Sequence, residues 1–350
     1  MRLESWSPVR VAKRVMLSAI LVCAILGLAT LPAAGGTFPK MDVKLAHVIP
    51  AETSLNKGAA KFSELMKERT GGAVTVQVFP NGQLGSEKDI VEQVRNGLIH
   101  MAVIGGTFLA NIDGWGAIGV FAMPYVMKTA TEEEQLPVLN RLARGPILKE
   151  AVANAPGISS LRALDMNWFY GMRHLTTGKK QVAKVDDIKG MKIRTPDAPL
   201  ARLPMASLGA VVTPLSMQEV YSALQMGVVD GQENPINTIF TAKLYEVQKY
   251  ITLTGHQTQN LCMIINEKFY QGLSPELKAV FDKTAIDAGD YQSDLQVKVN
   301  KDNLEEMKKK GVVVNTVNRA EFSEKTKDAW KDFESKLGKG LYEKIIDAQK

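Results

Sequence analysis

The chain has 350 residues, 45% of them hydrophobic and 23% charged, a balance that excludes disordered and fibrous proteins. At ~100 to 200 residues per domain, it holds material for roughly two globular domains. Its 43 basic and 37 acidic residues give a net charge of +6, but residues 1–35 hold four of the basic residues and one of the acidic ones. The remainder carries only +3. No segment combines Lys and Arg with interleaved aromatic residues, so nucleic acid is not an expected partner.

The first 36 residues have the order of a secretory signal. Arg10, Lys13 and Arg14 precede an uncharged run over residues 15–31, and a segment of small residues follows. We therefore predict a signal peptide over residues 1–35 that is cleaved near residues 33–36. Because a run of 17 residues is at the lower limit for a membrane span, an uncleaved N-terminal anchor is the competing interpretation.

Two cysteines are present, and only one is expected in the mature chain. Cys23 lies in the apolar run of the leader and follows Val22 rather than a small residue, which argues against lipid attachment. Cys262 then remains alone, so neither a disulfide nor a cysteine-based metal site can form within the chain. The four histidines are far apart and lack metal-ligand spacing. Because no nucleophile, base and oxyanion donor come together, we expect no metal, no cofactor and no catalysis.

Strands and helices are predicted to alternate in the first third of the chain. Valines alternate with polar residues over 74–78, the period of a half-buried strand. Thr53 or Ser54 can cap a helix that ends at Gly71-Gly72. The predicted elements here are a strand over 44–48, this helix, the strand over 74–78, a helix that begins at Ser86, and a strand over 101–104.

The rest of the chain continues this alternation and ends in one long helix. Thr131 with Glu134 and Ser216 with Glu219 match the capping box, in which side chains bind the free N–H groups of a helix start. A helical pattern begins at Ser274-Pro275 and extends to about Lys310, interrupted only by Gly289. Short strands are predicted over 191–194, 211–213 and 228–230. Since no Gly/Ser linker divides the chain, we predict an α/β protein of two lobes that the chain crosses between several times.

Three polar residues stand at the ends of predicted elements, where they suit an anion. Arg194 ends a strand that Thr195-Pro196 terminates, so its side chain points beyond the carboxyl end of the strand. In open α/β sheets ligands bind at that edge. Arg173 follows an aromatic run over residues 168–170, and Asn234 precedes a helix. Surface ion pairs or turn positions are the alternative interpretation of these residues.

Six sequence blocks carry a resemblance to a known family. The blocks are Phe79–Gly85, Tyr170–Thr177, Asp187–Pro196, Glu219–Gln225, Val229–Pro235 and Tyr245–Tyr250. In this order they resemble the periplasmic solute-binding subunits of TRAP transporters, the tripartite ATP-independent periplasmic family. The resemblance extends from about His47 to the C-terminus. It implies a two-lobed periplasmic binding protein fold of the α/β class, with mixed sheets, multiple crossovers and a long helix that spans both lobes.

The resemblance also implies a division of the chain and a function. We place lobe I at residues 36–169 plus about 257–299, and lobe II at residues 170–256 plus about 300–350. The two lobes would close over an organic acid in the periplasm and deliver it to a TRAP membrane permease driven by an ion gradient. We expect a monomer without enzymatic activity.

Site residues follow from the resemblance, position by position. Arg194 corresponds to the arginine that holds the ligand carboxylate bidentately, which a planar guanidinium does and an ammonium cannot. Arg173 corresponds to a second arginine on the same anion, and Asn234 to a pocket amide. The further predicted ligand-binding residues, placed by acidity, aromaticity or position alone, are Glu87, His47, Trp168, Asp197 and Met217.

The expected ligand is a small carboxylate. We favour a sugar acid such as a hexuronate over a C4-dicarboxylate, because the carboxylates of Asp197 and Glu87 suit hydroxyl groups better than a second ligand carboxylate. Two other classes remain as alternatives: a binding protein of an ATP-driven importer, and a secreted enzyme that acts on acidic sugars.

Overall fold

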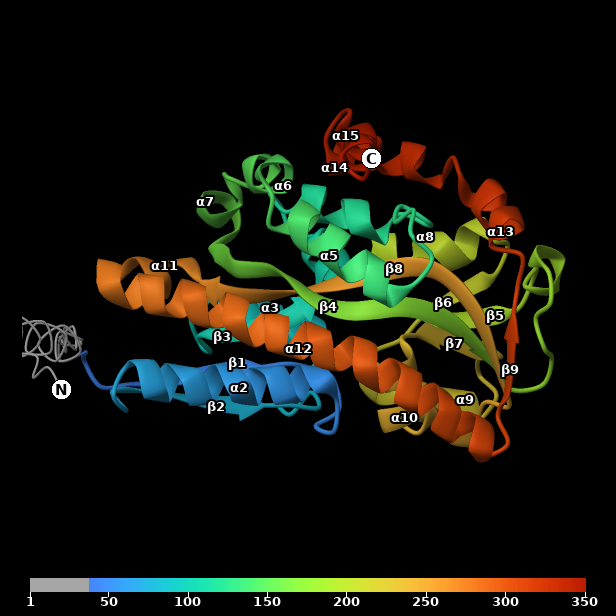
Figure 1. Cartoon of the computed structure of the whole chain (residues 1–350), viewed down its shortest axis with the longest axis horizontal. Helices are drawn as coiled ribbons and strands as arrows, with labels where there is room; N and C mark the ends of the chain where they lie inside the picture. The colour runs from blue at the N-terminus through green and yellow to red at the C-terminus, as the bar shows by residue number, and fades with distance from the viewer. Residues whose placement is uncertain (1–37) are drawn as a thin grey trace, which may run out of the picture. The chain divides into compact units, whose positions relative to one another are not determined.

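A mixed sheet of nine strands forms the centre of the described part of the chain, residues 38–350, in the computed structural model (Figure 1). The predicted signal peptide, its cleavage site and Cys23 lie outside the described residues. The strands are β1 (Met41–Ala46), β2 (Val74–Phe79), β3 (Met101–Gly105), β4 (Leu161–Thr177), β5 (Lys192–Thr195), β6 (Val211–Pro214), β7 (Gly231–Asn234), β8 (Tyr250–Asn266) and β9 (Val313–Thr316).

Helices cover this sheet and connect its strands. The α-helices are α2 (Ser54–Arg69), α3 (Glu87–Arg95), α4 (Gly106–Leu109), α5 (Glu132–Ala143), α6 (Pro146–Ala151), α7 (Ala155–Ser159), α8 (Pro199–Ser207), α9 (Val220–Gln225), α10 (Ile236–Thr241), α11 (Glu267–Gln271), α12 (Pro275–Lys309), α13 (Arg319–Thr326), α14 (Glu334–Leu337) and α15 (Leu341–Asp347). Short 3-10 helices are η1 (Gly116–Ala122), η2 (Val185–Asp187), η3 (Met217–Glu219), η4 (Leu244–Glu246) and η5 (Ala329–Phe333). Within residues 38–350, no helix is both long and apolar enough to cross a membrane.

Two strands of 17 residues, β4 and β8, join two parallel groups of strands into one sheet. The strand order is β2-β1-β3-β8-β4-β7-β5-β6, with β9 added to β8. β1 pairs in parallel with β2 and β3, and β5 pairs in parallel with β6 and β7, whereas β4 and β8 run antiparallel to each other. The predicted α/β class with a mixed sheet and several crossovers is therefore confirmed. Residues 39–350 form one compact unit, so the boundaries of the two lobes stay a prediction.

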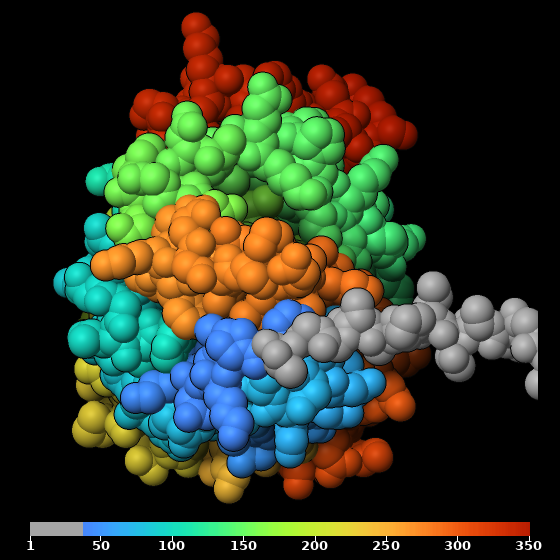
Figure 2. Space-filling view, turned by 90° about the vertical axis from the view of Figure 1, so that its left-hand side faces the viewer, coloured from blue at the N-terminus to red at the C-terminus, as the bar shows by residue number. Residues whose placement is uncertain are grey.

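Helix α12 is a single helix of 35 residues. Ser274 caps its start and Pro275 occupies its first turn, where a missing N–H costs nothing. The predicted long helix to about Lys310 is confirmed, and it continues through Gly289. Glycine is needed there for packing: a Cβ atom would lie 2.6 Å from Nε1 of Trp168 on β4. Figure 2 shows α12 in orange between α2 in blue and the green segment that carries α5 to α7.

Polar residues on the buried face of α12 bind the irregular backbone of β4. The pairing of β4 with β8 shifts register between Phe169 and Gly171, which leaves peptide groups there without partners in the sheet. Ser293 Oγ accepts the N–H of Phe169 at 2.9 Å, and Gln296 Nε2 donates to the carbonyl of Tyr170 at 2.7 Å. Buried peptide groups need such partners, so these polar residues fix the path of β4 where it approaches the candidate site.

Most predicted elements are confirmed, and one strand is misplaced. Both capping boxes are present, Thr131 with Glu134 and Ser216 with Glu219. The strand predicted over 228–230 is wrong: that segment is a turn, Val228 is 49% exposed, and β7 begins at Gly231. All four residues of β7 are buried although three of them are polar, so hydrophobicity could not locate this strand.

Glu132, the first residue of α5, holds β4 from the other side of the bulge. Its carboxylate accepts the N–H of Met172 at 2.6 Å and the amide of Asn300 of α12 at 2.7 and 2.9 Å. Gly171, with φ of +108°, leaves room for this carboxylate. Burial raises the pKa of Glu132 from its ordinary value of 4.5 to about 7, against the lowering effect of these hydrogen bonds.

This raised pKa leads to an expected pH dependence of stability. The folded chain binds the Glu132 proton more tightly than the unfolded chain, so the free energy of unfolding falls as pH rises from about 4.5 to 7. Between pH 5 and pH 8 we expect the wild type to lose about 2 to 3 kcal/mol relative to Glu132→Gln, which has no such proton. Urea unfolding of both proteins at the two pH values measures this difference. Parallel pH profiles of the two proteins would contradict the expectation.

Candidate functional site

A cavity of about 290 Å³ lies at the carboxyl ends of the parallel strands, the edge where ligands bind in α/β sheets. Its volume is at the lower end of the range for small-molecule sites. The residues that line it are Val48, Ile49, Ser86, Glu87, Lys88, Val103, Gly105, Phe108, Tyr170, Arg173, Arg194, Pro196, Asp197, Pro214, Leu215, Ser216, Met217, Gln218, Glu219, Asn234, Gln259 and Leu261. They come from the ends of β1, β3, β5, β6 and β7, from the start of α3, and from the middle of β4 and β8.

Arg194, near the end of β5, lines this cavity without an acidic partner. Its side chain is buried, and its Nε and Nη2 atoms donate to the carbonyl oxygen of Leu215 at 3.0 and 2.6 Å. No residue in 38–350 accepts a hydrogen bond from Nη1. Burial lowers the pKa of Arg194 to about 10, partly offset by the charge of Glu233, so the guanidinium stays cationic at neutral pH. A buried cation of this kind is suited to an anionic partner.

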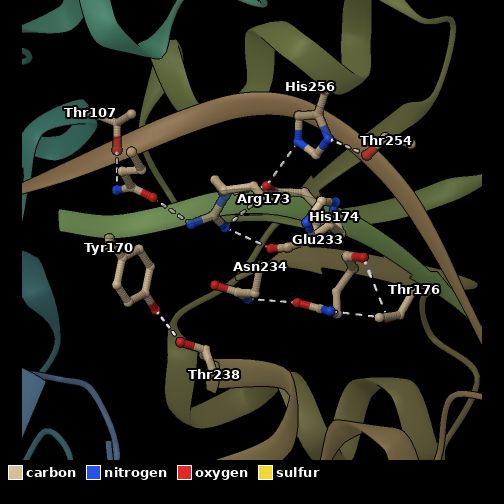
Figure 3. Close-up of polar contacts among 12 residues, drawn as sticks. Thr107, Tyr170, Arg173, His174, Thr176, Glu233, Asn234, Thr238, Thr254 and His256 are labelled. Carbon is tan, nitrogen blue, oxygen red and sulfur yellow. Dashed lines mark hydrogen bonds and ion pairs between the residues drawn. The ribbon is translucent and has the colours of Figure 1, made fainter. Parts of the chain in front are cut away.

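Arg173, on β4, already has such a partner in Glu233 of β7 (Figure 3). Its Nε and Nη2 atoms donate to the two carboxylate oxygens, and Nη2 also donates to the Glu233 carbonyl at 2.6 Å. Nη1 donates to Gln259 of β8. Burial alone would raise the pKa of Glu233, but Arg173 and His256 lower it to about 2. The charge of Arg173 is therefore neutralised, and its guanidinium retains one free N–H on Nη1.

The ion pair belongs to a buried network that joins three strands. His256 Nε2 lies 3.2 Å from Glu233 Oε2, and His256 Nδ1 lies 2.8 Å from Thr254 Oγ1. On the other side, Gln259 Nε2 donates to Thr107 Oγ1 at 3.3 Å. Burial lowers the pKa of His256, with Glu233 acting in the opposite direction. Figure 3 shows these contacts running along β4 and β8.

Tyr170 and Asn234 complete the polar wall beside the arginines. The hydroxyl of Tyr170 lies 2.7 Å from Thr238 Oγ1, and the amide nitrogen of Asn234 donates to Gln232 Oε1 at 2.6 Å (Figure 3). Both side chains are buried. The donor bond to Gln232 fixes the amide of Asn234 and leaves its Oδ1 as an acceptor toward the cavity.

Glu87 supplies a carboxylate opposite the arginines. Its Oε1 accepts the N–H of Gly105 at 2.7 Å. Burial raises the pKa of Glu87, while this hydrogen bond and the charges of Arg194 and Arg173 lower it. Because Oε1 already accepts this hydrogen bond, Oε2 is left to accept one from a hydroxyl group of a ligand.

The structure brings six of the eight predicted ligand-binding residues to the cavity wall: Arg194, Arg173, Asn234, Glu87, Asp197 and Met217. Asp197 lies at the rim, with a side chain 67% exposed and paired with Arg202 at 2.8 Å. Met217 begins η3.

His47 and Trp168 are not on the wall. His47, the residue after β1, is buried, its Nε2 lies 3.1 Å from Asn56 Oδ1, and burial lowers its pKa to about 4. Trp168 packs against α12 and donates from Nε1 to the carbonyl of Ala285 at 3.1 Å. The register shifts of β4 turn Trp168 toward the helix while Tyr170 faces the cavity.

Sequence reasoning missed the residues that position Arg173. Glu233, His256 and Gln259 hold or support its guanidinium, yet none was singled out as a site residue. A signal was present: residues 254–260 form a polar run in a position where a buried strand is expected to be apolar. Within residues 38–350, no three His, Cys, Asp or Glu side chains are grouped so that they could hold a metal ion.

Comparison with known proteins identifies similar chains over almost the whole described length. The model of the family named bacterial extracellular solute-binding protein, family 7, matches residues 45–336. The C4-dicarboxylate-binding periplasmic protein DctP of Rhodobacter capsulatus is 31% identical over 308 residues, 87% of each chain.

Solved structures are similar in fold as well as in sequence. One is the sugar acid binding protein DctPAm from Advenella mimigardefordensis in complex with galactonate, with a TM-score of 0.82, 28% identity and coverage of 89% of this chain and 98% of that one. Another is a TRAP periplasmic solute binding protein from Bradyrhizobium in complex with galacturonate, with a TM-score of 0.79, 30% identity and coverage of 88% and 100%.

Proposed function

The chain belongs to the bacterial extracellular solute-binding proteins of family 7, and from this membership we propose that it captures a small organic acid in the periplasm and delivers it to a TRAP membrane permease. The observation that carries the proposal is the buried, unneutralised guanidinium of Arg194 on the cavity wall. Charge-assisted hydrogen bonds contribute roughly 1.5 to 3 kcal/mol each, and a micromolar site needs about 8 kcal/mol. Arg194, the free N–H of Arg173 and Asn234 can supply much of that.

The charges of the cavity favour a sugar acid with one carboxylate, such as a hexuronate. Arg173 is compensated by Glu233, so Arg194 is the buried cation left for a ligand carboxylate. Glu87, opposite the arginines, and Asp197, at the rim, can accept hydroxyl groups, and the negative charge of Glu87 disfavours a second ligand carboxylate. Galactonate and galacturonate are bound by two of the similar structures. A C4-dicarboxylate is the second candidate, because the Rhodobacter relative is named for that ligand.

The proposed mechanism is a two-state closure of the lobes. Glu87 lies in the proposed lobe I and Arg194 in the proposed lobe II, so a ligand that contacts both favours the closed state. The long strands β4 and β8 run through the site, and their register shifts are the places where bending disturbs the fewest sheet hydrogen bonds. The exported chain acts as a monomer after removal of residues 1–35, and it binds its acid without turnover.

A thermal-shift screen of the mature chain against organic acids tests this function. Binding to the folded state alone stabilises it by about 2.7 kcal/mol at a hundredfold excess over Kd, which raises the melting temperature by several degrees. We expect hexuronates and aldonates to give this shift. A larger shift with succinate or malate would establish the dicarboxylate alternative, and no shift with any acid would contradict the function. Recovery of the acid unchanged after hours with the protein separates binding from catalysis.

A further inference from the structure

A second hollow, which we call the outer crevice, adjoins the ligand cavity. It measures about 300 Å³, about as much as the cavity itself. Its lining residues come from the loop after β1, the loop after β2, η3, α9 and the segment between α10 and η4. Several of them carry groups that bind sugar hydroxyls: Glu52, Asn81, Tyr221, Thr241 and Lys243.

Three residues separate the two hollows, because they line both of them. They are Val48 after β1 and Met217 and Gln218 in η3. We call these three residues the partition. Val48 and Met217 are half-buried and apolar, whereas Gln218 is exposed. The two apolar side chains thus stand between the charged groups of the cavity and the polar groups of the outer crevice.

Gln218 holds the partition against the opposite side of the cavity. Its Nε2 donates to the carbonyl of Gly85 at 3.4 Å, in the turn that leads into α3. The amide also rests directly on Gly82, where an added Cβ atom would overlap Nε2 of Gln218. The φ of +66° at Gly82 requires glycine as well. Gln218 of η3 therefore lies directly against this turn, at a glycine.

We propose that the partition of Val48, Met217 and Gln218 limits the ligand to a single sugar-acid unit, and that the outer crevice accepts a second sugar unit once the partition is removed. The inference rests on the proposed binding of a sugar acid. When Arg194 holds the carboxylate of a monomeric acid, the rest of that molecule occupies the cavity. The partition forms the side of the cavity that borders the outer crevice, so it stops a longer ligand from extending into the crevice. Truncation of Met217 joins the two hollows, whereas the polar residues of the crevice stay in place.

Calorimetric titration of the wild type and of Met217→Ala with D-galacturonate and its dimer, digalacturonate, tests the proposal. We expect the wild type to bind the dimer at least a hundredfold more weakly than the monomer. In Met217→Ala the two affinities are expected to lie within tenfold of each other. Leu261→Ala is the matched control, because it removes a similar volume from the cavity wall on β8 without bordering the crevice. The control is expected to keep the wild-type preference.

Two outcomes would overturn the inference while leaving the proposed function intact. One is a wild type that binds dimer and monomer equally, and the other is a Met217→Ala protein that binds the monomer but gains nothing for the dimer. If neither acid binds the wild type, the choice of sugar acid fails instead. In that case a crystal structure of Met217→Ala without ligand tests the role of the partition. One continuous hollow would support that role, and two separate hollows would overturn it.

Discussion

Replacing Arg194 by lysine is expected to weaken binding of the organic acid at least tenfold and to leave the melting temperature almost unchanged. The Nε and Nη2 atoms of the guanidinium both donate to the Leu215 carbonyl, and the N–H groups of Nη1 stay available for the ligand carboxylate. An ammonium group is a point donor that cannot hold the carbonyl and a carboxylate in the same fixed geometry. Its charge is retained, so the fold keeps its electrostatic balance. Calorimetric titration and thermal unfolding measure the two effects separately.

Arg162→Lys provides the control for this exchange. Arg162 lies on the same strand as Arg173, but it pairs with Glu267 at 2.7 Å and does not line the cavity. Its replacement removes a bidentate pair without touching the ligand, and we expect an unchanged affinity. If Arg194→Lys binds the acid as tightly as Arg162→Lys does, the role given to the Arg194 fork is wrong.

Glu233→Gln is expected to destabilise the fold by about 3 to 5 kcal/mol, the range for breaking a buried ion pair. The substitution leaves the guanidinium of Arg173 buried, charged and without its anion, and it leaves a single side-chain oxygen where two carboxylate oxygens face Arg173 and His256. The hydrogen bonds that Arg173 donates to Gln259 and to the backbone carbonyl of residue 233 cannot replace a full negative charge. Urea unfolding at pH 7 measures this loss, which is large against the 5 to 15 kcal/mol stability of a typical domain.

A double variant separates the buried charge from other effects of the substitution. The double variant Arg173→Met with Glu233→Gln no longer has the unpaired buried cation. We therefore expect the double variant to be more stable than Glu233→Gln alone. Glu305→Gln breaks an exposed helical pair with Lys308 and is expected to have a far smaller effect. A double variant that is less stable than Glu233→Gln would show that Arg173 stabilises the fold through packing rather than through charge.

The elements of the fold were predictable where local chemistry determines them. Capping residues such as Thr53, Ser86 and Ser274 accept backbone N–H groups at the helix starts where they were expected, because a cap acts within four residues of its own position. The alternation of valines located β2 in the same way. The α/β class and the crossovers follow from the order of these elements.

The full length of β4 and β8 was not predictable from local patterns. Both strands are bent by register shifts or carry buried polar residues, and neither shows a continuous alternation. The backbone of β4 is satisfied by Ser293 and Gln296 of α12, more than 120 residues further along the chain. Such distant partners leave no trace in the local sequence.

The candidate site was predictable in its outline and not in its electrostatics. Arg194 was identified from its position at the end of a strand, and the cavity lies there. The pairing of Arg173 with Glu233 joins residues 60 positions apart, and it determines which of the two arginines is neutralised. Trp168 was predicted to bind the ligand, but β4 shifts register beside it, and Trp168 packs against α12 while Tyr170 lines the cavity.

Cys262 gives the protein a practical property. Its thiol is fully buried on β8, and burial raises the pKa of that thiol. Residues 38–350 contain no other cysteine. A buried thiol with a raised pKa is a poor nucleophile, so we expect it not to react with maleimide reagents. Two cysteines introduced at exposed positions on either side of the cavity can therefore be labelled with fluorophores in an otherwise natural background. Energy transfer between the dyes would then follow the opening and closing of single molecules as acid is added.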